Sequence, residues 1–217
     1  MSPRIELTSE QIAMNDDLDN INQLFYRRGW TDGLPIVPPT LERVGKMLQY
    51  TDYEPSDVIT TIPPKYGEAT IEKIAINAVM AGCIPPYLPV IIAAVLAMSE
   101  EKFNLYGVQA TTHLCAPLLI ANGPIARELN FNCSYNAFGQ GWRSNATIGR
   151  AIRLILLNIG GGIPGVLDRA TLGQPGKFSY CIAENEEQNP WEPLHVERGF
   201  KREESTVTVV GAEGPHN

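Results

Sequence analysis

The sequence has no pair of cysteines in a Cys-x-x-Cys arrangement. Its four cysteines stand far apart along the chain, at Cys83, Cys115, Cys133 and Cys181. This spacing excludes a zinc ribbon and a thioredoxin-type redox motif, because both need cysteines close together in pairs. In a reducing cytosol we expect four free thiols, most of them buried.

Positive charge is also scarce. The 217 residues include 17 Lys and Arg against 24 Asp and Glu, which gives a net charge of -7. Binding to nucleic acid depends largely on Lys and Arg that neutralise phosphates, so this balance argues against a nucleic-acid partner. Charged residues make up only 19% of the chain, which is less than soluble domains usually carry.

The chain shows neither a signal peptide nor a membrane span. Its first twenty residues carry several carboxylates and no apolar core of the kind that a signal peptide has. The longest nearly uncharged stretch, residues 74–99, contains Pro85, Pro86 and Pro89. These prolines divide it into two short helices, whereas a membrane span needs about 20 uninterrupted apolar residues. We therefore expect a cytoplasmic protein without membrane contact.

Helices and strands alternate along the chain, separated by turns that its 19 glycines and 17 prolines mark. Apolar residues at helical spacing predict helices over residues 16–28, 41–48, 71–82, 87–98, 124–129 and 146–159. Apolar and β-branched runs predict strands over 34–37, 57–62, 103–112, 178–182 and 206–210, with a short buried element at 118–121. This order indicates an α/β (or α+β) fold with helices packed on a mixed sheet. The length suits a single domain over residues 1–217.

Capping residues mark several helix boundaries. Thr40, Thr70 and Asn145 each precede a predicted helix, where a side-chain oxygen accepts a hydrogen bond from a free backbone N–H group. Gly29 follows the first helix, at the position where a left-handed residue ends a helix. The helix after Asn145 is expected to bury its isoleucines and to turn Arg150 and Arg153 to another side.

The last predicted strand indicates an incomplete sheet. Residues 205–211 have the composition of a core strand, yet no helix follows them to cover it. Together with the low charge, this feature predicts that another chain completes the fold. The protein would then be the N-terminal portion of a fold divided between two subunits.

Two polar segments in the first two thirds of the chain are candidate functional sites. In residues 29–40, Asp32 and Gly33 are interpreted as a turn. In residues 111–117, His113 and Cys115 point to the same side of an extended chain. They would serve as a nucleophile with its base, or as two metal ligands. The alternative is a structural histidine beside a core thiol.

A glycine-rich loop that runs into a helix is the candidate anion site. Gly139 and Gly141 leave backbone N–H groups free, and Asn145 and Arg143 stand at the expected helix start. A helix N-terminus with an arginine beside it favours a carboxylate or a phosphate. The alternative is an irregular turn before an amphipathic helix.

An acidic loop near the end of the chain is the candidate catalytic segment. Glu184 and Glu186 precede His195, with which either would transfer protons or bind a metal. Trp191 lies between two prolines that stiffen the loop, and it is a candidate contact for the substrate. The alternative is a solvated acidic loop with Trp191 docked on the body of the protein.

Four stretches resemble a poorly characterised bacterial family that is associated with thioredoxin-like (seleno)proteins bearing a selenocysteine- or cysteine-Gly-Ser-Cys (UGSC) motif. They cover residues 29–40 (GWTDGLPIVPPT), 145–154 (NATIGRAIRL), 183–187 (AENEE) and 190–200 (PWEPLHVERGF). The resemblance implies that this chain matches the N-terminal half of longer members. It also implies thiol or redox chemistry, such as reductive cleavage of a carbon–heteroatom bond.

The expected function is therefore that of one subunit of a hetero-oligomeric enzyme. It would cleave a carbon–heteroatom bond of a small anionic organic substrate by hydrolysis, elimination or reduction. His113, Glu184 and His195 would act in acid–base catalysis or hold a transition metal (iron, copper or zinc), with Cys115 as a thiol. Gly139, Gly141, Arg143, Asn145 and Trp191 would bind the substrate. The alternative is a non-catalytic scaffold that docks a redox partner protein.

Overall fold

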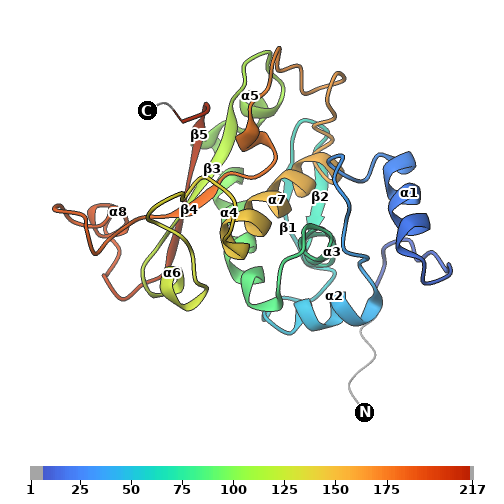
Figure 1. Cartoon of the computed structure of the whole chain (residues 1–217), viewed down its shortest axis with the longest axis horizontal. Coiled ribbons are helices and arrows are strands. Elements are labelled where there is room, and N and C mark those ends of the chain that lie inside the picture. Colours follow the sequence, from blue (N-terminus) through green and yellow to red (C-terminus); the bar gives the residue numbers. More distant parts are fainter. Residues whose placement is uncertain (1–6, 216–217) are drawn as a thin grey trace.

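A computed structural model describes residues 7–215 of the chain (Figure 1). The helices in this range are α1 (Leu18–Arg28), α2 (Leu41–Leu48), α3 (Ile71–Ala81), α4 (Leu88–Ser99), α5 (Leu105–Gln109), α6 (Pro124–Glu128), α7 (Arg143–Asn158) and α8 (Leu194–Glu197). The strands are β1 (Val58–Ile62), β2 (Gly67–Thr70), β3 (Ala116–Asn122), β4 (Cys181–Ala183) and β5 (Thr206–Ala212). Three short 3₁₀ turns complete the regular structure.

The strands form two small sheets. One is an antiparallel pair of β1 and β2. The other is mixed and has the order β4-β3-β5, in which β3 is parallel to β4 and antiparallel to β5. Helix α4 packs against β5 and α7 packs against β4. The prediction of helices on a mixed sheet, in an α/β or α+β fold, is therefore confirmed.

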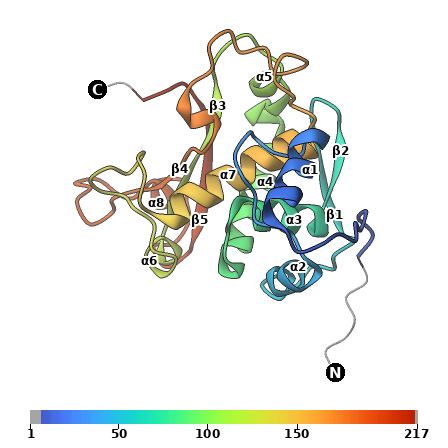
Figure 2. The ribbon, with the colours of Figure 1, turned by 45° about the vertical axis from the view of Figure 1, so that its right-hand side comes forward.

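Helix α7 runs across the middle of the molecule, with α3 and α4 beside it (Figure 2). The predicted inward residues are buried, at Ile148, Ile152, Ile155, Leu156 and Ile159. Burying each of these side chains contributes roughly 1.5–3 kcal/mol, so this helix is the centre of the hydrophobic core. The structure therefore confirms the apolar face that the sequence predicts for α7.

The capping predictions are confirmed at three positions and wrong at one. The side chains of Thr40 and Thr70 accept from the N–H groups of Arg43 and Lys73, and Gly29 ends α1 with φ of 69°. Asn145 is not a cap, because α7 begins two residues earlier, at Arg143. Trp142 occupies the N-cap position and makes no side-chain cap there.

Two predicted strands are wrong. Residues 34–37 belong to no sheet, and Leu34 lies in a bend. Residues 103–112 contain α5, because Asn104 adopts a left-handed conformation (φ 53°) and its side chain caps the helix by accepting from the N–H of Gly107. This local hydrogen bond favours a helix start over a strand. Within residues 7–215, no helix has both the length and the apolar composition that a membrane crossing requires.

Candidate functional site

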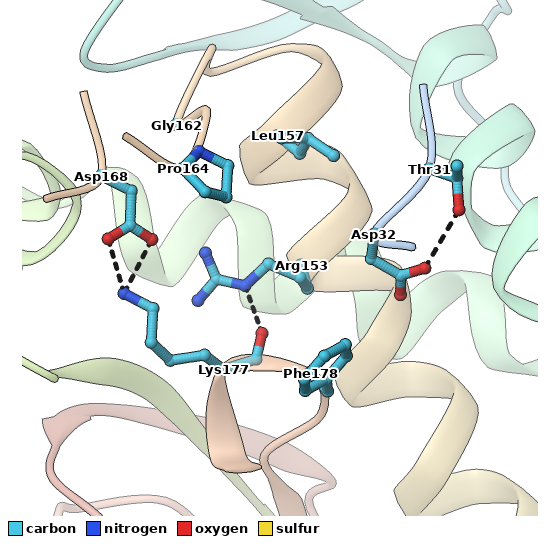
Figure 3. Close-up of a pocket in the computed structure, with 9 residues that line it drawn as sticks. All are labelled: Thr31, Asp32, Arg153, Leu157, Gly162, Pro164, Asp168, Lys177 and Phe178. Atoms are coloured by element: carbon cyan, nitrogen blue, oxygen red, sulfur yellow. Dashed lines mark hydrogen bonds and ion pairs between the residues drawn. The ribbon is translucent and has the colours of Figure 1, made fainter. Parts of the chain in front are cut away.

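The candidate site is a cavity of about 220 Å³ beside α7 (Figure 3). Its walls come from two parts of the chain that lie far apart in the sequence: the loop after α1, and the second half of α7 together with the loop that follows it. The lining residues are Thr31, Asp32, Arg153, Leu157, Gly162, Pro164, Asp168, Lys177 and Phe178. Charged and apolar side chains therefore share one small space.

One wall is held by an ion pair between Asp32 and Arg150. The Nε and Nη2 atoms of Arg150 lie 2.7 and 2.9 Å from the two carboxylate oxygens, so the pair is bidentate. The Asp32 side chain is only 4% exposed. Burial acts to raise the pKa of Asp32, but the hydrogen bonds and the charge of Arg150 outweigh it and lower that pKa below its ordinary value. The pair attaches the loop after α1 to α7.

A second ion pair, between Lys177 and Asp168, forms the opposite wall. The Lys177 Nζ atom lies 2.8 and 2.7 Å from the two oxygens of Asp168. Both side chains are largely buried, at 16% and 8% exposure. Asp168 also accepts from the backbone N–H of Ala170, which fixes the position of its carboxylate.

Arg153 lies between Asp32 and the Lys177–Asp168 pair, and it forms an ion pair with neither carboxylate (Figure 3). Its Nε atom donates to the backbone carbonyl of Lys177 at 2.6 Å. Its two terminal nitrogens make no hydrogen bond or ion pair with any residue in the range 7–215, and neither atom is sealed off from solvent. Burial lowers the pKa of Arg153, although Asp168 and Asp32 act to raise it. An arginine remains charged in proteins, so a guanidinium without a carboxylate partner faces the cavity.

The predicted pair of His113 and Cys115 lies elsewhere, just before β3. His113 is exposed, and its Nε2 atom pairs with Glu213 at 2.5 Å. No hydrogen bond joins it to Cys115 in the described part of the chain. Burial raises the pKa of the Cys115 thiol, which disfavours the thiolate that a nucleophile needs. The geometry is that of a surface ion pair beside a half-buried thiol.

Glu184 lies at the other end of β3, and the structure uses it to hold the acidic loop. Its oxygens accept from the side chain of Asn122 at 2.5 Å, from the side chain of Asn189 at 2.5 Å and from the backbone N–H of Leu194 at 2.8 Å. A carboxylate with this many donors is satisfied by the protein itself. These hydrogen bonds connect Glu184 to β3, to the acidic loop and to the start of α8.

Glu186 and His195 do approach each other. Glu186 accepts from the N–H of Gly123 at 2.7 Å, and its oxygen lies 3.9 Å from Nδ1 of His195. The His195 side chain is fully buried, and Nδ1 has no hydrogen-bond partner in the described range. His113 and His195 lie at opposite ends of β3, so they do not share a site. Across residues 7–215, no three side chains of His, Cys, Asp or Glu are grouped so as to hold a metal ion.

The predicted substrate-binding residues fall into two groups. Gly139 and Gly141 lie exposed on the loop before α7, and Arg143 is the exposed first residue of that helix. Asn145 is buried, and its side-chain amide bonds to both backbone groups of Asn132. It holds the preceding loop and is not free to contact a substrate.

Trp191 is 81% exposed, which contradicts the alternative in which it is docked on the body of the protein. It is not among the residues that line the cavity.

The residues that line the cavity were not predicted from the sequence as site residues. A signal existed in part, because Arg150 and Arg153 lie one turn apart on an otherwise apolar helix, and Asp32 precedes the glycine of a turn. Nothing in the sequence distinguishes Asp168 and Lys177 from ordinary loop residues. Only the folded chain brings these five side chains together.

Comparison of the chain with protein-family models, with curated proteins and with solved structures finds no match.

Proposed function

We propose that this chain is an enzyme subunit that binds a small organic carboxylate at Arg153 and cleaves a carbon–heteroatom bond of it. The observation that carries the proposal is the guanidinium of Arg153, which faces a cavity and has no carboxylate partner among the described residues. An uncompensated cation in a partly buried site favours an anionic ligand.

The charge balance around the cavity supports a singly charged ligand. Three cations (Arg150, Arg153 and Lys177) face two carboxylates (Asp32 and Asp168), and the two ion pairs consume four of these charges. One positive charge is left, which a single carboxylate neutralises. The planar guanidinium matches a carboxylate in a bidentate arrangement. A phosphate dianion would leave a surplus of negative charge in the same space.

The size and walls of the cavity limit the rest of the ligand. Its volume of about 220 Å³ lies below the roughly 300–1,000 Å³ of typical drug-sized sites. Leu157, Pro164 and Phe178 supply apolar surface next to the arginine. These features favour a carboxylate attached to a short apolar body.

The Lys177–Asp168 pair is the candidate acid–base group. Cleavage of a carbon–heteroatom bond by elimination or hydrolysis needs a group that takes up a proton and one that gives a proton to the leaving atom. An ammonium and a carboxylate within 2.8 Å of each other at the cavity wall supply groups of both kinds. The reaction class itself rests on the family resemblance.

The proposal is tested by calorimetric titration of the full chain with benzoate, with uncharged benzamide and with inorganic phosphate. We expect benzoate to bind and benzamide not to bind. Arg153→Gln should abolish benzoate binding, whereas Arg127→Gln, which removes an exposed arginine, should leave it unchanged. Preferred binding of phosphate, or loss of binding in Arg143→Gln but not in Arg153→Gln, would contradict the proposal.

Turnover is tested separately with short carboxylates that bear a thiol, amino or hydroxyl leaving group. Release of the leaving group should depend on both Arg153 and Lys177. The double variant Lys177→Met/Asp168→Asn, which removes one charge of each sign and so keeps the surplus positive charge of Arg153, should retain benzoate binding within a few-fold and lose the release of thiol or ammonia. If the double variant retains full turnover, the acid–base role of the pair is wrong.

A second candidate function, the docking of a redox partner protein, is favoured by Trp191. This residue is 81% exposed. Its loop is held in place by Glu184, which accepts hydrogen bonds from the Asn189 side chain and the Leu194 N–H. Tryptophan is enriched among the residues that contribute most to binding at interfaces. Co-expression with the protein encoded next to this chain tests the idea. Trp191→Ala should weaken that complex at least about tenfold without changing benzoate binding, since loss of an interface tryptophan commonly costs 2 kcal/mol or more.

A further inference from the structure

We infer that β5 is an interface through which two copies of this chain join their sheets edge to edge. In the mixed sheet, β3 lies between β4 and β5, so β5 is an edge strand (Figure 1). It pairs with β3 over its whole length, from Thr206 opposite Asn122 to Ala212 opposite Ala116. The proposed interface is the other edge of β5, which faces away from β3.

The hydrogen bonds of β3 show which β5 residues face outward. The N–H of Leu119 donates to Tyr180, and the carbonyl of Ala121 accepts from Glu184, so both residues turn their backbone groups toward β4. In an antiparallel ladder, the β5 residues directly opposite them then direct their own backbone N–H and carbonyl groups away from β3. These residues are Val209 and Val207.

Gly211 belongs to the same outward set. It lies opposite Pro117, which has no N–H to give to the ladder. Three residues of β5 therefore direct both an N–H and a carbonyl group to the open edge. In the described chain, no backbone hydrogen bond outside the ladder reaches these groups.

This edge also lacks the features that normally prevent strands from pairing. Natural edge strands carry lysine, proline or inward-facing charge, or they are interrupted by a bulge. Residues 206–212 read TVTVVGA and contain no charge and no proline. Their register with β3 is continuous. In a protein with a net charge of -7, an uncharged strand is a place where two copies meet without direct repulsion.

The outward groups are complementary to themselves. If two β5 strands run antiparallel with Val209 opposite Val209 of the second copy, then Val207 lies opposite Gly211 of that copy. Every outward N–H and carbonyl of both strands then has a partner. A shift by two residues would leave one outward residue of each copy unpaired.

The pairing is closed by a two-fold axis, the commonest symmetry of homo-oligomers. It joins the two three-stranded sheets into one continuous sheet. The family resemblance implies a different companion chain at this edge. The self-complementary pattern of the outward groups favours a second copy of the same chain instead.

The inference is tested by light scattering on the full chain from micromolar to millimolar concentration. We expect a species of twice the 23.9 kDa chain mass that dissociates on dilution. Val209→Pro removes an outward N–H and no hydrogen bond to β3, and proline is tolerated on edge strands. It should weaken the dimer at least tenfold while the circular dichroism spectrum stays that of a folded protein. Val210→Thr keeps the backbone and the branched shape of a partly exposed residue and should remain dimeric.

Amide hydrogen exchange provides a test without mutation. On dilution, the amides of Val207, Val209 and Gly211 should lose their protection, while those of Thr208 and Val210, which face β3, should keep theirs. A chain that stays monomeric at all concentrations, with the three outward amides exchanging freely, would overturn the inference. A dimer that Val209→Pro leaves intact would overturn it as well, because another surface would then hold the copies together.

Discussion

Asp32 and Arg150 are separated by 118 positions in the sequence and form a bidentate ion pair, with nitrogen–oxygen distances of 2.7 and 2.9 Å. The pair attaches the loop after α1 to the central helix and builds one wall of the cavity. Arg150 also donates to the backbone carbonyls of Leu34 and Pro35. Arg150 thus also holds the backbone at Leu34 and Pro35, just after Gly33.

We predict that Asp32→Asn destabilises the protein by about 3–5 kcal/mol, because breaking a buried pair leaves the other charge uncompensated. Urea unfolding at pH 7 measures this difference. Arg150→Met, which removes the other partner of the ion pair, should destabilise the protein as well. A loss below about 1 kcal/mol in both variants would mean that the pair behaves like an exposed one.

The stability conferred by Asp32 should depend on pH. Its pKa is lowered in the folded protein from the ordinary value of 3.8, so the unfolded chain takes up a proton before the folded one does. The contribution is therefore complete well above pH 4 and decreases as the pH falls through the folded pKa. Between pH 6 and pH 2, the free energy of unfolding should decrease more steeply with falling pH for the wild type than for Asp32→Asn. Parallel curves would contradict this prediction.

Glu184→Gln is predicted to loosen the acidic loop. The new amide places a donor where the carboxylate accepts from Asn122, Asn189 and Leu194, which costs roughly 1–3 kcal/mol. Hydrogen exchange should show reduced protection of the Leu194 amide, together with a lower melting temperature. Glu187→Gln, on an exposed neighbour, is the matched control. If Glu184→Gln abolishes turnover at an unchanged melting temperature, the residue is catalytic after all.

Arg153→Met should abolish benzoate binding without lowering the stability of the fold. The half-buried guanidinium lacks a carboxylate partner in the described range and its pKa is lowered by burial, so the cation disfavours the folded state. An apolar side chain of similar length should leave stability unchanged or raise it by about 1 kcal/mol. The same variant should lose benzoate binding. A large drop in the urea midpoint would instead show that Arg153 holds the fold together.

Gly123→Ala is predicted to be strongly destabilising, by about 3 kcal/mol or more, through strain and overlap. Gly123 has φ of 79°, and a Cβ atom there would overlap the backbone carbonyl of Glu204. Gly33→Ala is the control, since Gly33 also has positive φ (97°) but open space around it. It should cost only about 1 kcal/mol. Equal melting temperatures for the two variants would contradict the proposed close approach.

Some parts of this structure follow from local sequence. The side chains of Thr40 and Thr70 cap helices through hydrogen bonds that span only three residues, and Gly29 and Gly82 end helices because glycine adopts positive φ readily. The apolar face of α7 repeats at helical spacing. Such features depend on neighbours within a turn or two, which is why they could be predicted.

Other elements could not be predicted because a local contact competes with the composition. Residues 103–112 look like a strand, but the side chain of Asn104 favours a helix start. Asn145 has the residue type of a cap, yet its amide is taken by Asn132, thirteen positions away. In each case the hydrogen bonds of one side chain to the backbone, which the residue type alone does not specify, decide the local structure.

By itself, the sequence determined where most helices lie, that a mixed sheet accompanies them, and that the last strand carries no charge. The tertiary structure alone decided which charges meet. Arg150 and Arg153 are equivalent in the sequence, but folding gives Arg150 a carboxylate and leaves Arg153 facing the cavity. It also placed β5 at the edge of its sheet. The physical reason is that helix periodicity and caps arise within a few residues, whereas ion pairs and strand order depend on segments that meet only in the folded chain.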